Sequence, residues 1–225
     1  MKNLQNAKTF NIASLAVSFV NIAAAVFAVS RLPEKVPTHF DFNGVCNSFG
    51  SRWGLMFIAF IPLLLNFIFM LTARLINAKQ PKLIALTSFV ISVFFAAEFW
   101  LIYMVSSSGV QLGDKLERQP AITILPMMMS ALFIVLGNYT PIIAPNKFLG
   151  LRVKWTLQNP QCWKITHRFM GKVMVVTGLI TALLSVISYA FTEAGFATEF
   201  ILTFVMIAVS IFIPTIFAYN HRNDN

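Results

Sequence analysis

The most distinctive basic and aromatic residues of the sequence lie between Gly137 and Lys172. This segment contains six cations and no acid, and the cations are Lys147, Arg152, Lys154, Lys164, Arg168 and Lys172. Basic side chains without acidic neighbours suit contact with anionic lipid or with an acidic partner surface. The segment has no nucleophile–base pair and no phosphate-cradling glycine loop, and His167 alone does not make a catalytic constellation. The sequence therefore favours a binding surface over an active site, and we expect neither enzymatic activity nor a cofactor.

The local pattern of this segment indicates how it folds. Asn159 followed by Pro160 is typical of a helix N-cap with proline in the first turn. Trp163 and His167 are four residues apart, so they share a face of that helix. Two interpretations stay open: a basic loop that its tryptophans anchor at the lipid interface, or a docking surface for a cytoplasmic protein.

One acid, Glu98, lies deep inside an apolar run. A carboxylate in hydrocarbon costs several kcal/mol unless it is paired or protonated. It could line a polar cavity and bind a partner group or a proton. Alternatively, it could face the bundle and bond polar side chains such as Asn66 and Asn21.

The polar connector from Arg31 to Gly54 contains His39 and Asp41, which would point to the same side of an extended chain. The pair could bind a cation or an amine, but a metal site usually needs three or four ligands, so we expect no metal. The connector is predicted to form a folded cap over the bundle, with Phe40 and Phe42 at the interface. We expect His39, Asp41, Asn43 and Glu98 to contact an external ligand or to shape its cavity.

The composition predicts the helices that hold these residues in place. The chain has 225 residues, of which 57% are hydrophobic and 11% are charged, whereas a soluble domain has about 25% charged residues. Runs of about 20 apolar residues cross a bilayer as helices. The sequence has six such runs, at residues 12–30, 55–73, 83–106, 121–139, 173–191 and 200–218. We therefore predict an all-α integral membrane protein with six transmembrane helices and proline kinks inside the second, fourth and sixth.

The distribution of cations predicts the orientation. With both termini in the cytoplasm, twelve Lys and Arg residues fall inside and five outside, as the positive-inside rule requires. The net charge of +9 lies in short connectors at membrane ends, which argues against direct nucleic-acid binding. This topology also puts Cys46 and Cys162 on opposite sides of the membrane, where they cannot pair.

The two halves of the chain carry a faint internal repeat. Each half has three spans, residues 1–106 with an outer connector at 31–54 and residues 107–225 with a cytoplasmic connector at 140–172. The residues around Arg52 and Trp53 resemble those around Arg152 and Trp155, and a proline pair precedes each group. Halves with an odd number of spans insert in opposite directions, so a 3+3 inverted repeat is expected.

Two stretches resemble a known family. GNYTPIIAPNKFLGLRVKWTL followed by WKITHRFMGK is similar to the signature of the SdpI family, immunity proteins against the sporulation-delaying protein toxin of Gram-positive bacteria. LPEKVPTHFDFNGVCNSFGSRWG resembles a short N-terminal domain of unknown function often found with it. The chain departs from the family pattern at Val153-Lys154, where members tend to have Thr-Pro. The positions that match the motif are Asn138, Pro141, Asn146, Gly150, Arg152, Trp155, Thr156, Trp163, Thr166, His167 and Gly171.

The resemblance implies a multi-pass cell-membrane protein of a Gram-positive bacterium. Such a protein protects its cell from an antimicrobial peptide acting at the membrane, and in some members it also recruits a cytoplasmic repressor. The expected partners are thus the lipid bilayer, a peptide toxin on the outer side and a repressor protein inside. From the residues themselves, a small transporter that uses a polar cavity around Glu98 is the alternative. A lipid-modifying enzyme is a third option, which the missing catalytic constellation disfavours.

Overall fold

The computed structural model describes residues 2–75, 80–116, 120–146, 148–191 and 196–223. Six of its helices are long and apolar enough to cross a membrane, so the prediction of a six-span membrane protein is confirmed. They are α1 (Lys2–Val29), α2 (Leu55–Leu75), α3 (Pro81–Ser107), α4 (Pro120–Tyr139), α6 (Pro160–Phe191) and α7 (Phe196–Asn220).

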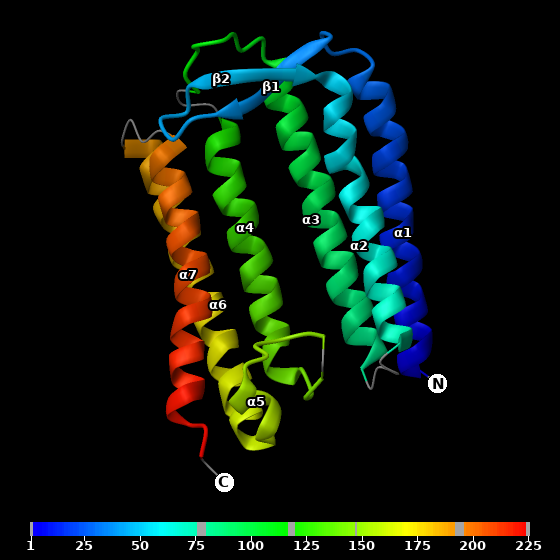
Figure 1. Ribbon diagram of the computed structural model, residues 1–225, viewed down its shortest axis with the longest axis vertical. Coiled ribbons are helices and arrows are strands. Elements are labelled where there is room, and N and C mark those ends of the chain that lie inside the picture. Colours follow the sequence, from blue (N-terminus) through cyan, green and yellow to red (C-terminus); the bar gives the residue numbers. More distant parts are fainter. Residues whose placement is uncertain (1, 76–79, 117–119, 147, 192–195, 224–225) are drawn as a thin grey trace.

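The long helices form two groups of three, α1–α2–α3 and α4–α6–α7, which stand side by side (Figure 1). The groups meet mainly where α3 packs against α4. Both termini lie at one end of the molecule, together with the short helices η2 (Thr140–Ile142) and α5 (Lys154–Gln158). We call this the terminal end. Its cytoplasmic orientation and the inverted repeat stay predictions.

Proline begins three of the helices, and the predicted start at Asn159-Pro160 is confirmed. Pro81, Pro120 and Pro160 each begin a helix, where the missing N–H costs no intrahelical bond. Asn159 caps α6, because its side-chain oxygen accepts hydrogen bonds from the backbone N–H groups of Gln161 (2.9 Å) and Cys162 (3.1 Å). The helix that begins here continues without a break through the fifth span. The amphipathic segment and the span therefore form one helix of 32 residues.

The opposite end carries a β-hairpin, an element that the all-α prediction did not include. Strand β1 (Lys35–Phe40) pairs antiparallel with β2 (Cys46–Ser51), and the 3-10 turn η1 (Arg52–Gly54) leads into α2. Asp41 builds the turn, since one of its carboxylate oxygens accepts from the N–H groups of Asn43 and Val45, both at 2.9 Å. Gly44 adopts a φ of 78°, which favours glycine. We call this end the hairpin end.

The hairpin is bonded to the connector between the two helix groups. The N–H of Cys46 donates to Asp114 (2.8 Å), and the N–H groups of Gly113 and Leu116 donate to Cys46 (2.8 Å) and Gly44 (2.9 Å). The hairpin also reaches over to the second group, where Phe42 meets the ring of Phe200 edge-on at 6.2 Å between centroids. The predicted cap over the bundle is thus a hairpin that bridges both groups (Figure 1).

Asn66 holds the first helix group together from its centre. Its side-chain amide donates to Ser14 (3.0 Å) and Ser18 (2.8 Å) of α1, and its carbonyl accepts from Ser88 (2.6 Å) and Ser92 (3.2 Å) of α3. All four hydrogen-bonding positions of this buried amide are filled. Such bonds replace the hydrophobic effect, which does not act between helices in lipid.

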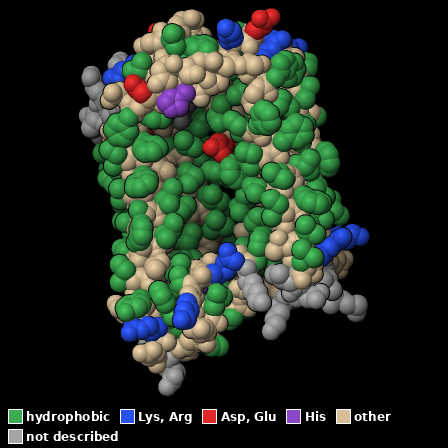
Figure 2. Space-filling view, viewed as in Figure 1, with side chains coloured by type: hydrophobic (Ala, Val, Ile, Leu, Met, Phe, Trp, Pro, Cys, Tyr) green, Lys and Arg blue, Asp and Glu red, His purple; other side chains and the backbone are tan. Residues whose placement is uncertain are grey.

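The outer faces of the helices are apolar. Side chains such as Phe57 (83% exposed), Phe212 and Leu183 point away from the protein, and Figure 2 shows hydrophobic side chains covering the middle of the molecule with charged groups towards both ends. An apolar belt between charged ends fits a bilayer.

Candidate functional site

A cavity of about 590 Å³ lies between the two helix groups, directly under the hairpin. Pro37, Thr38 and Phe40 of β1 form its roof, and α2, α3, α4 and α7 supply its walls. Figure 2 shows this side of the molecule hollowed between the groups, with an acidic side chain inside the hollow. The walls are mostly apolar, with residues such as Leu101, Leu125 and Met129.

Glu98 of α3 lines this cavity and is half-buried. The partners suggested for a purely structural role bond elsewhere, since Asn66 joins the serines of α1 and α3, and Asn21 donates to the carbonyl of Ala59 (3.2 Å). The structural interpretation of Glu98 through these two amides is therefore wrong. Its placement in a cavity favours the other interpretation, a role in binding.

A second acid, Glu199 of α7, lines the same cavity. It lies in the first turn of α7 and is 3% exposed. Neither of its carboxylate oxygens has a hydrogen-bond partner among the described residues. Helical spacing was the missed signal, because Phe196, Glu199, Phe200 and Thr203 recur at three- and four-residue intervals and all line the cavity.

The three polar residues predicted to contact a ligand from the hairpin, His39, Asp41 and Asn43, are not among the residues that line the cavity. A ring nitrogen of His39 is 2.6 Å from the side-chain oxygen of Asn47, and Asp41 is engaged by the turn. Asn43 is exposed. His39 and Asp41 thus bond different partners and do not form one site with Glu98. Within the described residues, no group of three or more His, Cys, Asp or Glu side chains could hold a metal ion.

At the terminal end, His167 and Trp163 form the centre of the folded loop. The two rings stack at 4.0 Å between centroids, and both side chains are buried. His167 Nδ1 donates to the carbonyl of Trp163 (2.8 Å), and Nε2 accepts from the backbone N–H of Leu151 (3.1 Å). These two bonds require a neutral imidazole with its proton on Nδ1. His167 therefore holds the loop onto α6.

Gly150 is the position that lets the loop approach this ring. It adopts a φ of 99°, a conformation that other residues rarely take. A β-carbon at this position would lie 3.0 Å from Cδ2 of His167 and closer still to Nε2. The glycine is required by both its backbone conformation and the close approach.

Other motif residues shape the same loop. The side-chain oxygen of Asn146 accepts from the N–H groups of Phe148 and Leu149, both at 2.7 Å. Thr156 is buried, and its hydroxyl is 2.8 Å from the carbonyl oxygen of Leu151. Thr166 is buried beside the thiol of Cys162, 3.9 Å away. These residues fix the loop from within, and the two buried threonines are inaccessible to a partner.

Gly171 and Pro141 set the contact between α4 and α6. A β-carbon on Gly171 would lie 2.6 Å from the carbonyl oxygen of Gly137 and 2.9 Å from Cδ of Pro141. The helices therefore approach as closely as their backbones allow. Asn138 is exposed and donates to the carbonyl of Ile134 in its own helix (2.9 Å).

The surface of the loop is formed by a different set of residues. Trp155 packs its ring edge against Tyr219 at 5.4 Å and is half-buried. Leu157 is 50% exposed. The exposed cations are Arg152, Lys154, Lys164, Arg168 and Lys172, and Lys147 lies outside the described residues. We call these five cations and Leu157 the basic surface.

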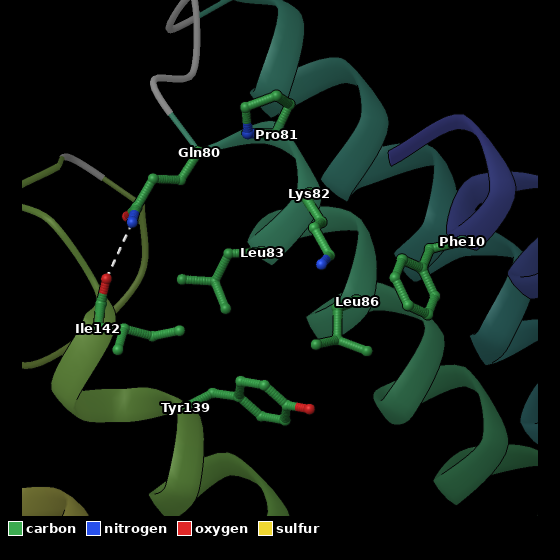
Figure 3. Close-up of a pocket in the computed structure, with 8 residues that line it drawn as sticks. All are labelled: Phe10, Gln80, Pro81, Lys82, Leu83, Leu86, Tyr139 and Ile142. Atoms are coloured by element: carbon green, nitrogen blue, oxygen red, sulfur yellow. Dashed lines mark hydrogen bonds between the residues drawn. The ribbon is translucent and has the colours of Figure 1, made fainter. Parts of the chain in front are cut away.

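A small pocket of about 280 Å³ separates the helix groups near the terminal end. Gln80 reaches across it, and Figure 3 shows its side chain directed at the carbonyl of Ile142 (2.9 Å). Its oxygen also accepts from the N–H of Ala144 (2.7 Å). Gln80 thus connects the start of α3 to the loop of the second group, a role that its sequence context did not reveal.

Two family models match separate parts of the chain. Residues 142–218, which contain the folded loop and most of α6 and α7, match the family model of the SdpI/YfhL protein family. Residues 16–65, which include the hairpin, match a domain of unknown function (DUF1648).

A relative matches almost the whole chain. The protein is 24% identical over 215 residues to the immunity protein SdpI of Bacillus subtilis (strain 168), and the match covers 94% of this chain and 95% of that protein. No solved structure matches the chain. The resemblance to the SdpI family is therefore confirmed, with both of its parts in the expected order, and the protein is a multi-pass membrane protein.

Proposed function

We propose that this protein is a membrane immunity protein that protects its cell from a membrane-active peptide toxin. The observation that carries the proposal is the match to the Bacillus subtilis immunity protein over 94% of the chain, because it includes both connectors and all six spans. The organism is a Gram-positive bacterium on this proposal. The toxin would be met at the hairpin end, which is extracytoplasmic if the cation distribution predicts the orientation correctly.

The geometry of the hairpin end supports this role. The hairpin exposes His39 and Asn43, and the turn η1 that follows it exposes Trp53. Phe40, the last residue of β1, lines the cavity that contains Glu98. A peptide could bind on the exposed side of the hairpin or insert an apolar segment beneath it.

A protection assay tests the proposal. The chain is expressed in a Bacillus subtilis strain that lacks its own SdpI, and survival is measured against added sporulation-delaying protein toxin. We expect survival well above that of the empty-vector strain. Equal killing of both strains, with the protein shown by immunoblot to be in the membrane, would refute this function for that toxin.

A second part of the proposal concerns signalling through the terminal end. The basic surface would hold a cytoplasmic repressor through complementary charge. We expect Arg152→Glu to lower the recruitment of a fluorescently tagged repressor to the membrane without lowering survival. Lys82→Glu is the matched control, because Lys82 is an exposed cation of the other helix group. Equal effects of both variants would contradict a specific docking surface.

The cavity also supports a second candidate function, a transporter or exporter. Two helix groups with a carboxylate-lined cavity between them are an arrangement that small transporters use. We expect Glu98→Gln to abolish export at normal membrane abundance if the protein works this way. Full protection by Glu98→Gln would favour toxin binding at the hairpin surface instead.

A further inference from the structure

Two carboxylates, Glu98 and Glu199, share one apolar cavity. They come from opposite walls, since α3 belongs to the first helix group and α7 to the second. Among the described residues that line the cavity there is no Lys, Arg or His. The other polar side chains among the described lining residues are the hydroxyl groups of Thr38, Ser106 and Thr203.

The carboxylate of Glu199 is the decisive feature of this cavity. Its side chain is almost fully buried, yet neither carboxylate oxygen has a partner in the described part of the chain. A buried carboxylate in a membrane protein is destabilising unless a cation, a donor or a proton compensates it. A second carboxylate in the same cavity increases this need, because like charges repel. A positively charged ligand would compensate both carboxylates at once.

The walls decide which kind of cation fits. A bare divalent ion needs six or more oxygen ligands or a cluster of His, Cys and carboxylate groups, and such a cluster is absent among the described residues. The volume of about 590 Å³ is that of a site for a small organic molecule. Phe40, Phe196 and Phe200 add aromatic surface, which attracts an organic cation as well as its apolar body.

We propose that the cavity is a binding site for an ammonium group carried on an apolar body, with Glu98 and Glu199 as its anionic partners. The ammonium donates hydrogen bonds to the two carboxylates, and the apolar body fills the space between α3, α4 and α7. The same chemistry is offered by a lipophilic amine and by a lysine side chain or amino terminus of an apolar peptide. Occupancy by the toxin rests on the proposed function, whereas the site itself does not.

The test compares an amine with its uncharged counterpart. The purified full chain is placed in phosphatidylcholine nanodiscs, and binding of 4-phenylbutylamine and 4-phenylbutanol is measured by calorimetry. We expect the amine to bind at least about ten-fold more tightly, since each tenfold corresponds to about 1.4 kcal/mol of charge-assisted bonding. Glu98→Gln and Glu199→Gln should each remove most of this preference.

Two controls keep the result interpretable. Glu34→Gln removes an exposed acid of the outer connector and should leave amine binding unchanged. Retained binding of 4-phenylbutanol by each variant shows that the cavity has kept its shape. If the parent protein binds amine and alcohol equally, or if neither cavity variant weakens the amine, the carboxylates are neutralised internally and the proposal is overturned.

A displacement arm identifies the source of the ammonium. Sporulation-delaying protein toxin, untreated or with all its amines acetylated, is added to the amine-loaded protein. Displacement by the untreated toxin alone assigns the site to a peptide ammonium. Amine binding without displacement by either form supports a site for small lipophilic amines. Since no cell survival enters this experiment, its failure is distinguishable from failure of the immunity function.

Discussion

Replacing Gly150 by alanine would place a methyl group against the buried ring of His167. The added carbon would lie 3.0 Å from Cδ2 and nearer to Nε2, on the side where the N–H of Leu151 donates to Nε2 at 3.1 Å. The loop would have to move away from α6, and this hydrogen bond would break.

The cost of this substitution has two parts. A residue with a β-carbon in the left-handed conformation costs about 1–2 kcal/mol, and φ at Gly150 is 99°. Leaving the buried Nε2 without its donor costs about 1–3 kcal/mol. The sum is a loss of about 2–5 kcal/mol in the stability of the loop. Gly109 provides a control away from the loop, because it has a φ of 79° and no atom within 4 Å of an added β-carbon.

Trypsin measures the loop directly. Arg152 and Lys154 follow Gly150 closely and are exposed, so cleavage there reports how often the loop opens. With a loss of about 2–5 kcal/mol in loop stability, Gly150→Ala should speed this cleavage by about 30- to 4,000-fold. Cleavage is followed by mass spectrometry on the protein in nanodiscs.

Gly109→Ala should leave the cleavage rate at the loop at the parent value, because Gly109 lies at the hairpin end, after α3. Equal rates for Gly150→Ala and the parent would refute the close contact between this loop and His167. Faster cleavage in both variants would mean that the loop opens with the whole bundle.

Three further substitutions test the packing that positions the site. Asn66→Leu removes four hydrogen bonds and should lower the free energy of unfolding in mixed micelles by about 2 kcal/mol, at about 0.6 kcal/mol for each bond. Its matched control, Asn21→Leu, removes one hydrogen bond and should lower the free energy of unfolding by less than half as much. Gly171→Ala forces α4 and α6 apart and should cost about 1–3 kcal/mol, and an unchanged thermal midpoint would contradict the close helix contact. Trp163→Phe loses the indole hydrogen bond of 2.8 Å and should lower loop stability by about 1 kcal/mol, read by the same trypsin assay.

The parts of the fold that were predicted from sequence are those governed by local rules. Six apolar runs give six helices because lipid leaves the backbone no other hydrogen-bond partner. Asn159-Pro160 identifies a helix start because the capping hydrogen bond joins residues only two apart in the sequence. The β-hairpin was missed because its strands follow no clear alternation and its partner at residues 113–116 lies far along the chain.

The candidate site was only half visible for the same reason. Glu98 could be identified because apolar residues surround it in the sequence. Glu199 follows a short polar stretch, and an acid in such a place is usually exposed. Their common cavity depends on how two helix groups dock, which no local pattern encodes. Similarly, Gly150 and His167 were recognised as motif positions, but their contact across 17 residues needed the fold.

The hairpin has a mechanical consequence for the two helix groups. Three backbone hydrogen bonds attach it to the connector between the groups. At the opposite end the described residues link the groups through side chains, namely the two hydrogen bonds of Gln80 and the edge-on contact of Phe69 with Phe148 at 5.1 Å between centroids. If the groups rock against each other, the hairpin end is the pivot and the Gln80 end travels further, because displacement grows with distance from a pivot. The cavity with Glu98 and Glu199 sits next to that pivot. It would keep its dimensions through such a motion while the pocket beside Gln80 opens and closes.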